Sequence, residues 1–374
     1  MVKNILYIGG FNFKNTNASS IRVLENARFF KKLNHNVEIL GKIEGKEPIY
    51  IKDVKTSNIL KEGGGGFASD ISAIKLKVIS SHIDCIIAYN YPPIAFYKLL
   101  KFCKNNNIEL IPDLTEWYGI DGKLTFDKGV RYVLNQWRML FLNKKCKHKI
   151  VASNYLDTYY KKSNNLVLPF VTIDSSIFEE KYYIDSGAIS FVYAGSPGNN
   201  FSKDRLDIVL EAFAKVKGEN TNFLFNIVGL TREELYIMPS VRKAVALLGE
   251  NLKCFGRLKN DQTIDVLKKS NFVVFARDIN KVTSAGFPTK VFEAFKYGLP
   301  VLTNKTSDID KYVNKQNGFL VEKANADEFS NCINSILTSN IETLTTVIEN
   351  CRKNNPFFYE NYINNTELFF KKID

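Results

Sequence analysis

The stretch from residue 271 to 303 constrains the fold of this chain more than any other part of it. It begins with Asn271-Phe272-Val273-Val274-Phe275-Ala276, a short run of β-branched and aromatic residues that is typical of a buried parallel strand. Gly298 and Pro300 then end a predicted helix, and the next strand begins at Leu299. A strand, a helix and a second strand in this order predict a parallel α/β sheet.

The predicted helix begins after the loop Gly286-Phe287-Pro288, and its first turn tolerates Pro288. The amides of that turn belong to Thr289, Lys290 and Val291, and we expect them to point out of the carboxyl edge of the strands. A helix N-terminus at that edge is an anion site, which the charge of Lys290 strengthens. Glu293 follows one turn later, where it could bind a diol such as a ribose. These features together predict a nucleotide site.

Taken singly, these residues also fit plain structural roles. Val291 suits the buried side of an amphipathic helix, and Glu293 near the N-terminus favours the helix dipole. Their arrangement is more specific, and it resembles the donor-sugar motif of retaining, GT-B-fold glycosyltransferases of family 4, also called group 1. The resemblance is strongest to bacterial capsule, exopolysaccharide and O-antigen enzymes. That family carries two glutamates eight positions apart: Glu293 matches the second, which faces the ribose, and Ala285 replaces the first, which faces the sugar.

Length and charge favour a two-domain protein with anionic partners. The chain has 374 residues and a formal net charge of +12, which favours nucleotide diphosphates, anionic lipid surfaces or nucleic acid as partners. The six cysteines form no Cys-x-x-Cys pair and the three histidines have no metal-ligand spacing, so we expect reduced thiols and no metal site. No signal peptide or membrane-spanning run is evident. We expect a cytoplasmic protein, at most peripheral on the inner face of the plasma membrane.

The first residues predict a Rossmann-like domain. An apolar strand from Asn4 to Ile8 runs into Gly9-Gly10, and a helix with apolar residues at helical spacing follows. The glycine pair without further glycines is not the dinucleotide fingerprint. The opening resembles the acceptor domain of the same family, in which Gly10 and Arg22 take the places of a loop glycine and an early arginine.

Two carboxylates follow the strand at 108–111. Asp113 and Glu116 lie just past its carboxyl end, where a Rossmann-like domain would present acid–base groups. Polysaccharide-assembly members of the family carry a similar Asp-x-x-Glu-Trp-Tyr run on the acceptor side, so the resemblance adds Trp117 and Tyr118 as surfaces for sugar stacking. The same spacing also fits a helix N-cap with its capping-box partner. Both interpretations stay open.

Residues 131–149 contain no acidic side chain and carry six cations: Arg131, Arg138, Lys144, Lys145, Lys147 and Lys149. A basic amphipathic helix of this kind can lie on an anionic membrane surface. The alternative is a helix that covers its own core and exposes the cations to solvent. We do not expect nucleic acid as a partner, because the aromatic residues here do not form a stacking platform.

The second half predicts the phosphate-binding cations. A strand ends at Gly195, where the family has an arginine directly after the glycine and a lysine further on, both of which bind the donor diphosphate. Lys203 matches the lysine, whereas Ser196 replaces the arginine. Arg277 directly follows the strand at 271–276 and is predicted to supply the missing charge. Gly256-Arg257-Leu258 resembles the segment that contacts the nucleotide base.

These observations predict an α/β fold of GT-B architecture. We expect an acceptor domain at 1–170, a hinge at 171–187 and a donor domain at 188–355, with a C-terminal helix at 356–374 that returns to the first domain. The resemblance implies two Rossmann-like parallel-sheet domains that face each other across a cleft.

The resemblance also implies the reaction. A hexose or related sugar would pass, with retention, from a UDP- or GDP-sugar to a saccharide or polyprenyl-diphosphate-linked glycan in cell-surface polysaccharide synthesis. No cofactor or metal is expected, because Lys203, Arg277, Lys290 and helix amides would stabilise the leaving diphosphate. One alternative is a catalytically inactive relative that binds a glycan or a partner, for which Ala285 is the best argument. Another is a nicotinamide oxidoreductase, against which the missing glycine fingerprint counts.

Overall fold

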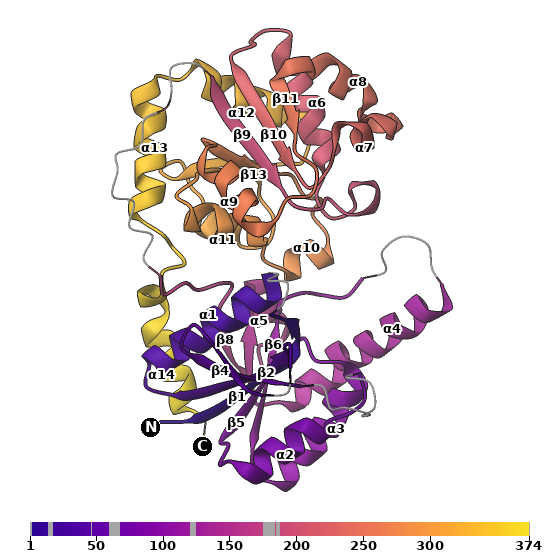
Figure 1. Cartoon of the computed structure of the whole chain (residues 1–374), viewed down its shortest axis with the longest axis vertical. Coiled ribbons are helices and arrows are strands. Elements are labelled where there is room, and N and C mark those ends of the chain that lie inside the picture. Colours follow the sequence, from indigo (N-terminus) through magenta and orange to yellow (C-terminus); the bar gives the residue numbers. More distant parts are fainter. Residues whose placement is uncertain are drawn as a thin grey trace. The chain divides into compact units, whose positions relative to one another are not determined.

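The computed structural model describes residues 2–13, 18–45, 47–59, 68–119, 125–174, 184 and 188–373. Its contacts divide the chain into two compact units (Figure 1). The first comprises Met1–Ser175, Ser284–Phe287 and Phe357–Asp374, and the second comprises Ser176–Thr283 and Pro288–Pro356. Most of the predicted hinge at 171–187 lies outside the described residues.

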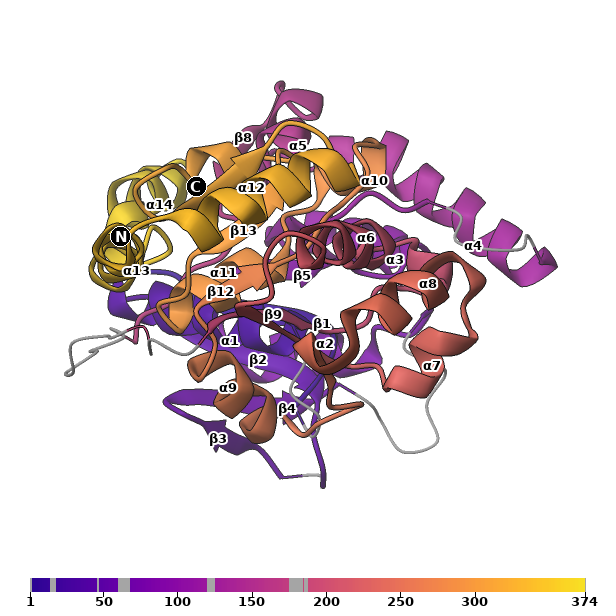
Figure 2. The ribbon, with the colours of Figure 1, turned by 90° about the horizontal axis from the view of Figure 1, so that it is seen from above.

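The first unit is built on an eight-stranded sheet of order β3-β4-β2-β1-β5-β6-β7-β8. Neighbouring strands are parallel except for β3, which pairs antiparallel with β4 at one edge (Figure 2). The strands are β1 (Asn4–Asn12), β2 (Asn36–Lys42), β3 (Ile49–Ile51), β4 (Val54–Asn58), β5 (Cys85–Tyr89), β6 (Glu109–Leu114), β7 (His148–Val151) and β8 (Asn164–Val167).

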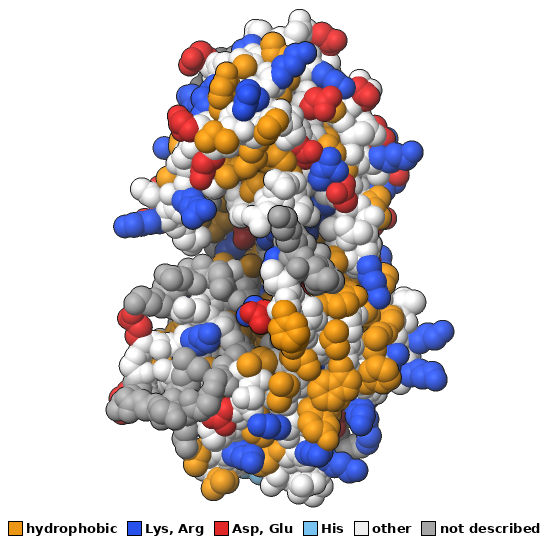
Figure 3. Space-filling view, turned by 90° about the vertical axis from the view of Figure 1, so that its right-hand side faces the viewer, with side chains coloured by type: hydrophobic (Ala, Val, Ile, Leu, Met, Phe, Trp, Pro, Cys, Tyr) orange, Lys and Arg blue, Asp and Glu red, His pale blue; other side chains and the backbone are white. Residues whose placement is uncertain are grey.

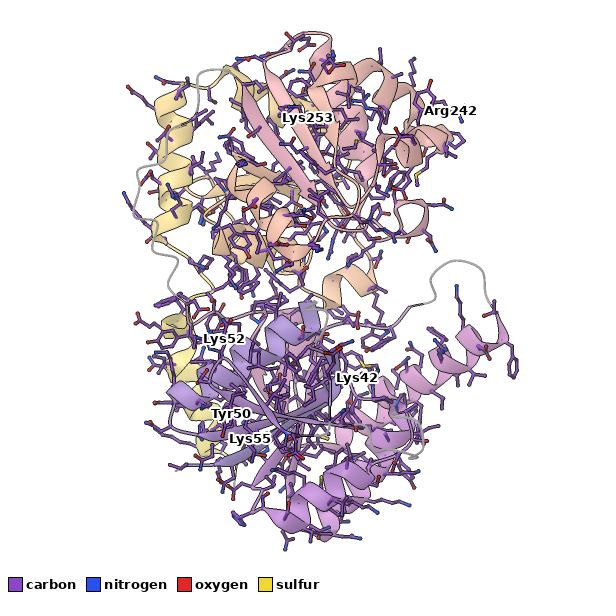
Figure 4. All side chains as sticks on the ribbon, viewed as in Figure 1. Lys42, Tyr50, Lys52, Lys55, Arg242 and Lys253 are labelled. Atoms are coloured by element: carbon purple, nitrogen blue, oxygen red, sulfur yellow. The ribbon has the colours of Figure 1, made fainter. Side chains whose placement is uncertain are left out.

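Both faces of this sheet are buried. Successive residues of β1 alternate between two core clusters, with Ile5 and Tyr7 in one and Leu6 and Ile8 in the other. Apolar residues at every position are what a parallel sheet covered on both faces requires, which explains why the strand lacks a polar alternation. At this edge of the sheet, Lys52 lies in the turn between β3 and β4, and Lys55 lies on β4 opposite Tyr50 of β3 (Figure 4).

Six α-helices are described in the first unit: α1 (Ala18–Lys32), α2 (Ser72–Ser80), α3 (Pro93–Asn105), α4 (Phe126–Trp137), α5 (Asn154–Tyr159) and α14 (Ile363–Lys371). The C-terminal helix α14 packs on the first sheet, as the sequence predicted. Its Phe369 and Phe370 join the core cluster that contains Ile5 and Tyr7.

The prediction of one amphipathic helix over residues 131–149 is wrong. Helix α4 ends at Trp137, a π-turn at Arg138–Leu142 and a 3-10 turn at Asn143–Lys145 follow, and β7 begins at His148. Arg138 is buried. It donates a hydrogen bond to the carbonyl of Tyr91, and its guanidinium lies 4.9 Å from the ring centre of Tyr118. Lys149 is also buried. Two of the six cations therefore belong to the core.

The second unit contains a six-stranded parallel sheet of order β11-β10-β9-β12-β13-β14. Its strands are β9 (Ile189–Ala194), β10 (Phe223–Val228), β11 (Leu252–Cys254), β12 (Phe272–Val274), β13 (Val301–Asn304) and β14 (Gly318–Val321). Its helices are α6 (Leu206–Lys217), α7 (Arg232–Ile237), α8 (Pro239–Leu248), α9 (Asn260–Lys268), α11 (Thr289–Lys296), α12 (Ala326–Thr338) and α13 (Ile341–Lys353), while α10 (Lys281–Ala285) joins the two units.

The strand order of the second sheet indicates where a ligand would bind. The chain builds outward from β9 to β11 on one side and then restarts at β12 on the other side of β9. Ligands of open α/β sheets bind where the order reverses, outside the carboxyl ends of the two strands that meet there. In this unit those strands are β9 and β12.

Candidate functional site

Three strands of the second sheet are followed by glycine turns at this edge. Gly195 follows β9, Gly229 follows β10 and Gly256 follows β11, with φ angles of +131°, +118° and +64°. Residues that carry a side chain rarely adopt these backbone angles, so glycine is the residue that fits. A Cβ atom on Gly229 would collide with the carbonyl of Gly195, which shows how closely the two turns pack.

A buried ionic cluster lies beneath Gly195. The carboxylate of Asp204 accepts a hydrogen bond from Nε of Arg277 at 2.7 Å and forms an ion pair with Nζ of Lys290 at 2.8 Å. The hydroxyl of Tyr193 donates to the same carboxylate at 3.0 Å. A Cβ on Gly195 would lie 2.7 Å from Nζ of Lys290. The structure thus brings together two of the predicted phosphate-binding residues, Arg277 and Lys290.

The three charged side chains of this cluster are almost fully inaccessible to solvent. Burial by itself would raise the pKa of Asp204, but Lys290 and Arg277 outweigh it and hold that pKa below its usual range. Burial, followed by the charge of Asp204, raises the pKa of Tyr193. Asp204 is therefore an anion and Tyr193 a neutral hydrogen-bond donor at physiological pH.

The first turn of α11 offers two amides to a ligand. Pro288 is the N-cap residue, and the amide of Val291 already donates to its carbonyl at 3.1 Å. Within the described part of the chain, the amides of Thr289 and Lys290 have no hydrogen-bond partner. Of the three amides that the sequence indicated, two remain available to an anion.

Glu293 has the properties expected of a ligand-binding carboxylate. It is partly exposed, and its side chain has no hydrogen bond or ion pair to any described residue. Burial raises its pKa, an effect that Lys290, Lys203 and Lys296 oppose through their charges. A carboxylate that is partly desolvated and unpaired gains hydrogen bonds when a diol binds to it.

Other residues assigned to the donor by sequence lie at the rim of this edge. Ser196 and Lys203 are exposed in the turn between β9 and α6, and Arg257 is exposed after β11, with Leu258 beside it partly buried. Lys203 is close enough to Glu293 to affect its pKa. Their contact with a nucleotide stays a prediction.

The segment Ser284–Phe287 packs with the first unit. Ala285 is fully buried in an apolar cluster with Leu114, Trp117 and Met139, and its carbonyl accepts a hydrogen bond from the hydroxyl of Ser153 at 2.7 Å. The position of the family's first glutamate is therefore occupied by a small residue in apolar surroundings. Gly286 is half-buried, and the ring of Phe287 lies 5.6 Å from that of Phe357.

A second ionic cluster occupies the first unit. Asp113 is completely buried and pairs with Arg22, whose Nη2 lies 2.8 Å from Oδ1. The hydroxyl of Tyr7 donates to its other oxygen, and Asn26 donates to that hydroxyl at 3.2 Å. The N-cap interpretation of Asp113 is wrong, because the residue lies inside β6 and pairs with Tyr89 and Ile150. The role of Asp113 as an acid–base group stays a prediction. Its carboxylate already accepts three hydrogen bonds, one from Tyr7 and two from Arg22.

The other predicted acceptor residues differ in accessibility. Glu116 is exposed and accepts a hydrogen bond from Asn90 at 3.4 Å, and Gly10 is exposed within β1. Trp117 is buried, with Tyr159 edge-on at 5.0 Å. Burial raises the pKa of Tyr118, against the effect of the guanidinium of Arg138. Trp117 is thus a core residue of the first unit, whereas Glu116 lies at its surface.

Sequence reasoning missed Asp204 and Tyr193. Asp204 directly follows the predicted phosphate-binding Lys203, and an acid in a turn beside a cation gave a usable signal. Nothing local marks Tyr193, which lies inside an apolar strand.

Among the described residues, no group of three His, Cys, Asp or Glu side chains could hold a metal ion. No helix in the described ranges is long and apolar enough to span a bilayer.

Comparison with known proteins agrees with the fold. Residues 192–354 match the family model of glycosyl transferases group 1. Sucrose-phosphate synthase from Thermosynechococcus elongatus superposes with a TM-score of 0.69 at 12% identity, covering 99% of both chains. A glycosyltransferase from Rickettsia africae gives 0.67 at 15% identity, covering 100% of this chain and 98% of its own.

A third structure was solved with a nucleotide. It is a variant of TarM from S. aureus bound to fondaparinux, α-GlcNAc-glycerol and UDP, with a TM-score of 0.66, 14% identity and coverage of 99% of this chain and 100% of its own. No curated protein matches the chain significantly. Residues 192–354 of the second unit are thus similar to a glycosyl transferases group 1 domain, and the whole chain has the GT-B fold.

Proposed function

We propose that this protein transfers a hexose or related sugar, with retention, from a nucleotide-diphosphate sugar to a saccharide or polyprenyl-diphosphate-linked glycan in cell-surface polysaccharide synthesis. The second unit would bind the donor and the first the acceptor. The leaving diphosphate would be stabilised by Arg277, Lys290 and the amides of α11, with Lys203 at the rim, so that neither a metal nor a cofactor is needed.

One observation carries the proposal. At the point where the strand order reverses in a domain that matches the group 1 glycosyltransferase model, the buried Lys290 and two partnerless amides lie one helical turn from the unpaired carboxylate of Glu293. The buried Arg277 shares the carboxylate of Asp204 with Lys290. The positive groups suit a diphosphate and the carboxylate of Glu293 suits a ribose. UDP in the TarM structure is the kind of ligand that this arrangement would bind.

Thermal unfolding with UDP-, GDP-, dTDP- and CMP-sugars tests the donor. A ligand at a hundred times its dissociation constant stabilises by about 2.7 kcal/mol, which is a readable shift. We expect one nucleotide class to stabilise the wild type and not Glu293→Ala, with EDTA leaving the shift unchanged. No shift with any donor would count against the proposal.

The inactive alternative has one observation in its favour, the burial of Ala285 among apolar side chains. A relative that only binds a glycan or a partner would need no sugar-facing carboxylate. Slow hydrolysis of the donor, followed as release of the nucleoside diphosphate, distinguishes the two, because an inactive relative releases none.

A lipid-linked acceptor requires contact with a membrane, and we propose that α4 provides it. This helix has no buried residue, and Phe126, Val130 and Val133 expose 86%, 43% and 63% of their surface. A groove of about 560 Å³ follows the same side chains. Figure 3 shows hydrophobic side chains gathered on this face of the first unit with lysines and arginines beside them. Lys128 and Arg131 are exposed on α4, which suits an anionic surface.

Sedimentation with vesicles tests this contact. We expect binding to vesicles of phosphatidylglycerol and phosphatidylcholine, weakened by salt, and little binding to phosphatidylcholine alone. Phe126→Ser with Val133→Ser should weaken it at least about tenfold, because burial of such side chains contributes about 1.5–3 kcal/mol each. Ile237→Ser, an equally exposed residue of α7, serves as the control.

A further inference from the structure

We propose that Asp204 is a positioning residue of the donor site, which holds Arg277 and Lys290 together and directs their remaining hydrogen-bond donors toward the diphosphate. The role rests on the proposed use of this edge for a nucleotide diphosphate. Asp204 itself would not touch the ligand.

The division of contacts on Asp204 supports this role. One carboxylate oxygen accepts from Arg277 at 2.7 Å, and the other lies 2.8 Å from Lys290 and accepts from Tyr193 at 3.0 Å. Each oxygen therefore orients one cation. The residue is completely inaccessible to solvent, so no water competes for these bonds.

Both cations keep donors for a second anion. Arg277 uses Nε for Asp204, and within the described part of the chain its two terminal nitrogens have no hydrogen-bond partner. Its main chain is fixed separately, because its amide donates to Asn304 and its carbonyl accepts from Asn304, both at 2.9 Å. Lys290 has three donors, and Asp204 is its one ionic partner among the described residues. Its ammonium also lies 4.8 Å from the ring centre of Tyr193.

Without the carboxylate, the cluster would lose its order. Two buried cations beside one another repel and lack solvation, so each would turn toward water. With Asp204 the cluster keeps one net positive charge, and both cations are held before a ligand arrives. Such preorganisation lowers the cost of binding and of stabilising charge on a leaving group.

The side chain of Asp204 is not needed to anchor its loop. The amides of Lys203 and Asp204 donate to the carbonyl of Pro197 at 2.9 and 3.1 Å, and the amide of Arg205 donates to the carbonyl of Ala276 at 2.8 Å. Main-chain bonds therefore tie the loop to the end of β12. This leaves the orientation of the cations as the function of the carboxylate.

Isothermal titration with inorganic pyrophosphate and with UDP and GDP tests the role, because positioning and net charge predict opposite results. Asp204→Asn removes one negative charge from the site, so charge alone would tighten pyrophosphate binding. Positioning predicts binding at least tenfold weaker. Asp207→Asn is the matched control: it removes the same charge three residues away, from a carboxylate that pairs with Arg205 at 2.8 Å, and should change the affinity less than twofold.

A second pair of variants keeps the test valid if Asp204→Asn fails to fold. Asp204→Asn combined with Lys290→Gln removes one charge of each sign, so no additional unpaired charge is buried. We expect this double variant to bind pyrophosphate at least fivefold more weakly than Lys290→Gln alone, because Arg277 loses its partner. Equal or tighter binding in the double variant, or in Asp204→Asn, would overturn the role.

The same titrations separate this role from the proposed function. If the wild type binds pyrophosphate in an Asp204-dependent way but binds no nucleotide, the positioning role stands and the proposed function fails. If UDP or GDP binds equally to the wild type and Asp204→Asn, the role fails and the function stands. A wild type that binds neither pyrophosphate nor nucleotide overturns both.

Discussion

At the scale of single residues, the second unit contains features that lower its stability at the positions where it would bind a ligand. Glu293 is a partly buried carboxylate without a described partner, and Gly195 has a φ of +131° directly above Lys290. Neither feature stabilises the fold. Stability is commonly lower at functional positions for this reason, and substitutions there can raise stability while they abolish binding.

Glu293→Gln should raise the stability of the fold while it abolishes nucleotide binding, and the gain in stability should depend on pH. Burial raises the folded-state pKa of Glu293 above its unfolded value, so its ionisation destabilises the fold as pH rises through the folded pKa. We therefore expect the Gln variant to melt at a higher temperature than the wild type at pH 7–8. The difference should disappear near pH 4, where the carboxyl group is largely protonated in both states. Melting curves across this range, with and without nucleotide, check both stability and loss of binding.

Gly195→Ala should cost stability and ligand binding together. The alanine would adopt a backbone angle that costs about 1–3 kcal/mol, and its Cβ would press on Nζ of Lys290. Gly218→Ala is the matched control, because Gly218 has a φ of −63° at the end of α6. There the change should lie within about 1 kcal/mol. Urea denaturation gives the two free energies, and equal values for the two variants would contradict the prediction.

At the scale of elements, local pattern predicted the strands and helices whose contacts are regular. The apolar runs predicted β1 and β9, and Gly298, with a φ of +67°, ends α11 at the predicted place. Local pattern did not predict the burial of residues whose partners are distant in the sequence. Arg138 resembled a surface cation of a long helix, but its burial depends on Tyr91, forty-seven positions away.

The residues of the candidate site also differ in how well the sequence predicts them. The cations Arg277 and Lys290 could be predicted, because strand ends and a helix N-terminus bring them to one edge. Their shared partner Asp204 was missed: its place beside Lys203 could have marked it, but its pairing with Arg277, 73 positions away, leaves no local pattern. The N-cap interpretation of Asp113 failed for the same reason: its three-residue spacing to Glu116 fits a capping box, whereas its actual partner Arg22 lies 91 positions away.

The C-terminal helix α14 gives a prediction at this scale. Phe370 is buried, with Phe30 edge-on at 5.2 Å and the ring of His35 at 4.4 Å. Phe370→Ala should destabilise the first unit by about 3–5 kcal/mol, because it leaves a cavity in the core. Leu368→Ala on the same helix is the control, since 55% of Leu368 is exposed. Chemical denaturation distinguishes them, and similar losses would mean that α14 contributes little to this core.

At the scale of the whole molecule, the chain consists of two units, each with its own parallel sheet. The core around β1 receives α14 from the far end of the chain, whereas Asp204, Arg277, Lys290 and Glu293 of the candidate donor site all belong to the second unit. Units with separate cores can unfold separately. A ligand that binds one of them then stabilises that unit alone, by mass action.

Calorimetry should therefore resolve two transitions that respond to different changes. A nucleotide at a hundred times its dissociation constant should raise one transition, that of the second unit, by the equivalent of about 2.7 kcal/mol. Phe370→Ala should lower the other and leave the ligand-induced shift intact, because the substitution lies in the first unit. Glu293→Gln should abolish the shift and leave the first-unit transition where it was. If a single transition moved with both the ligand and Phe370→Ala, the two units would fold as one cooperative body, and donor binding would then stabilise the acceptor unit as well.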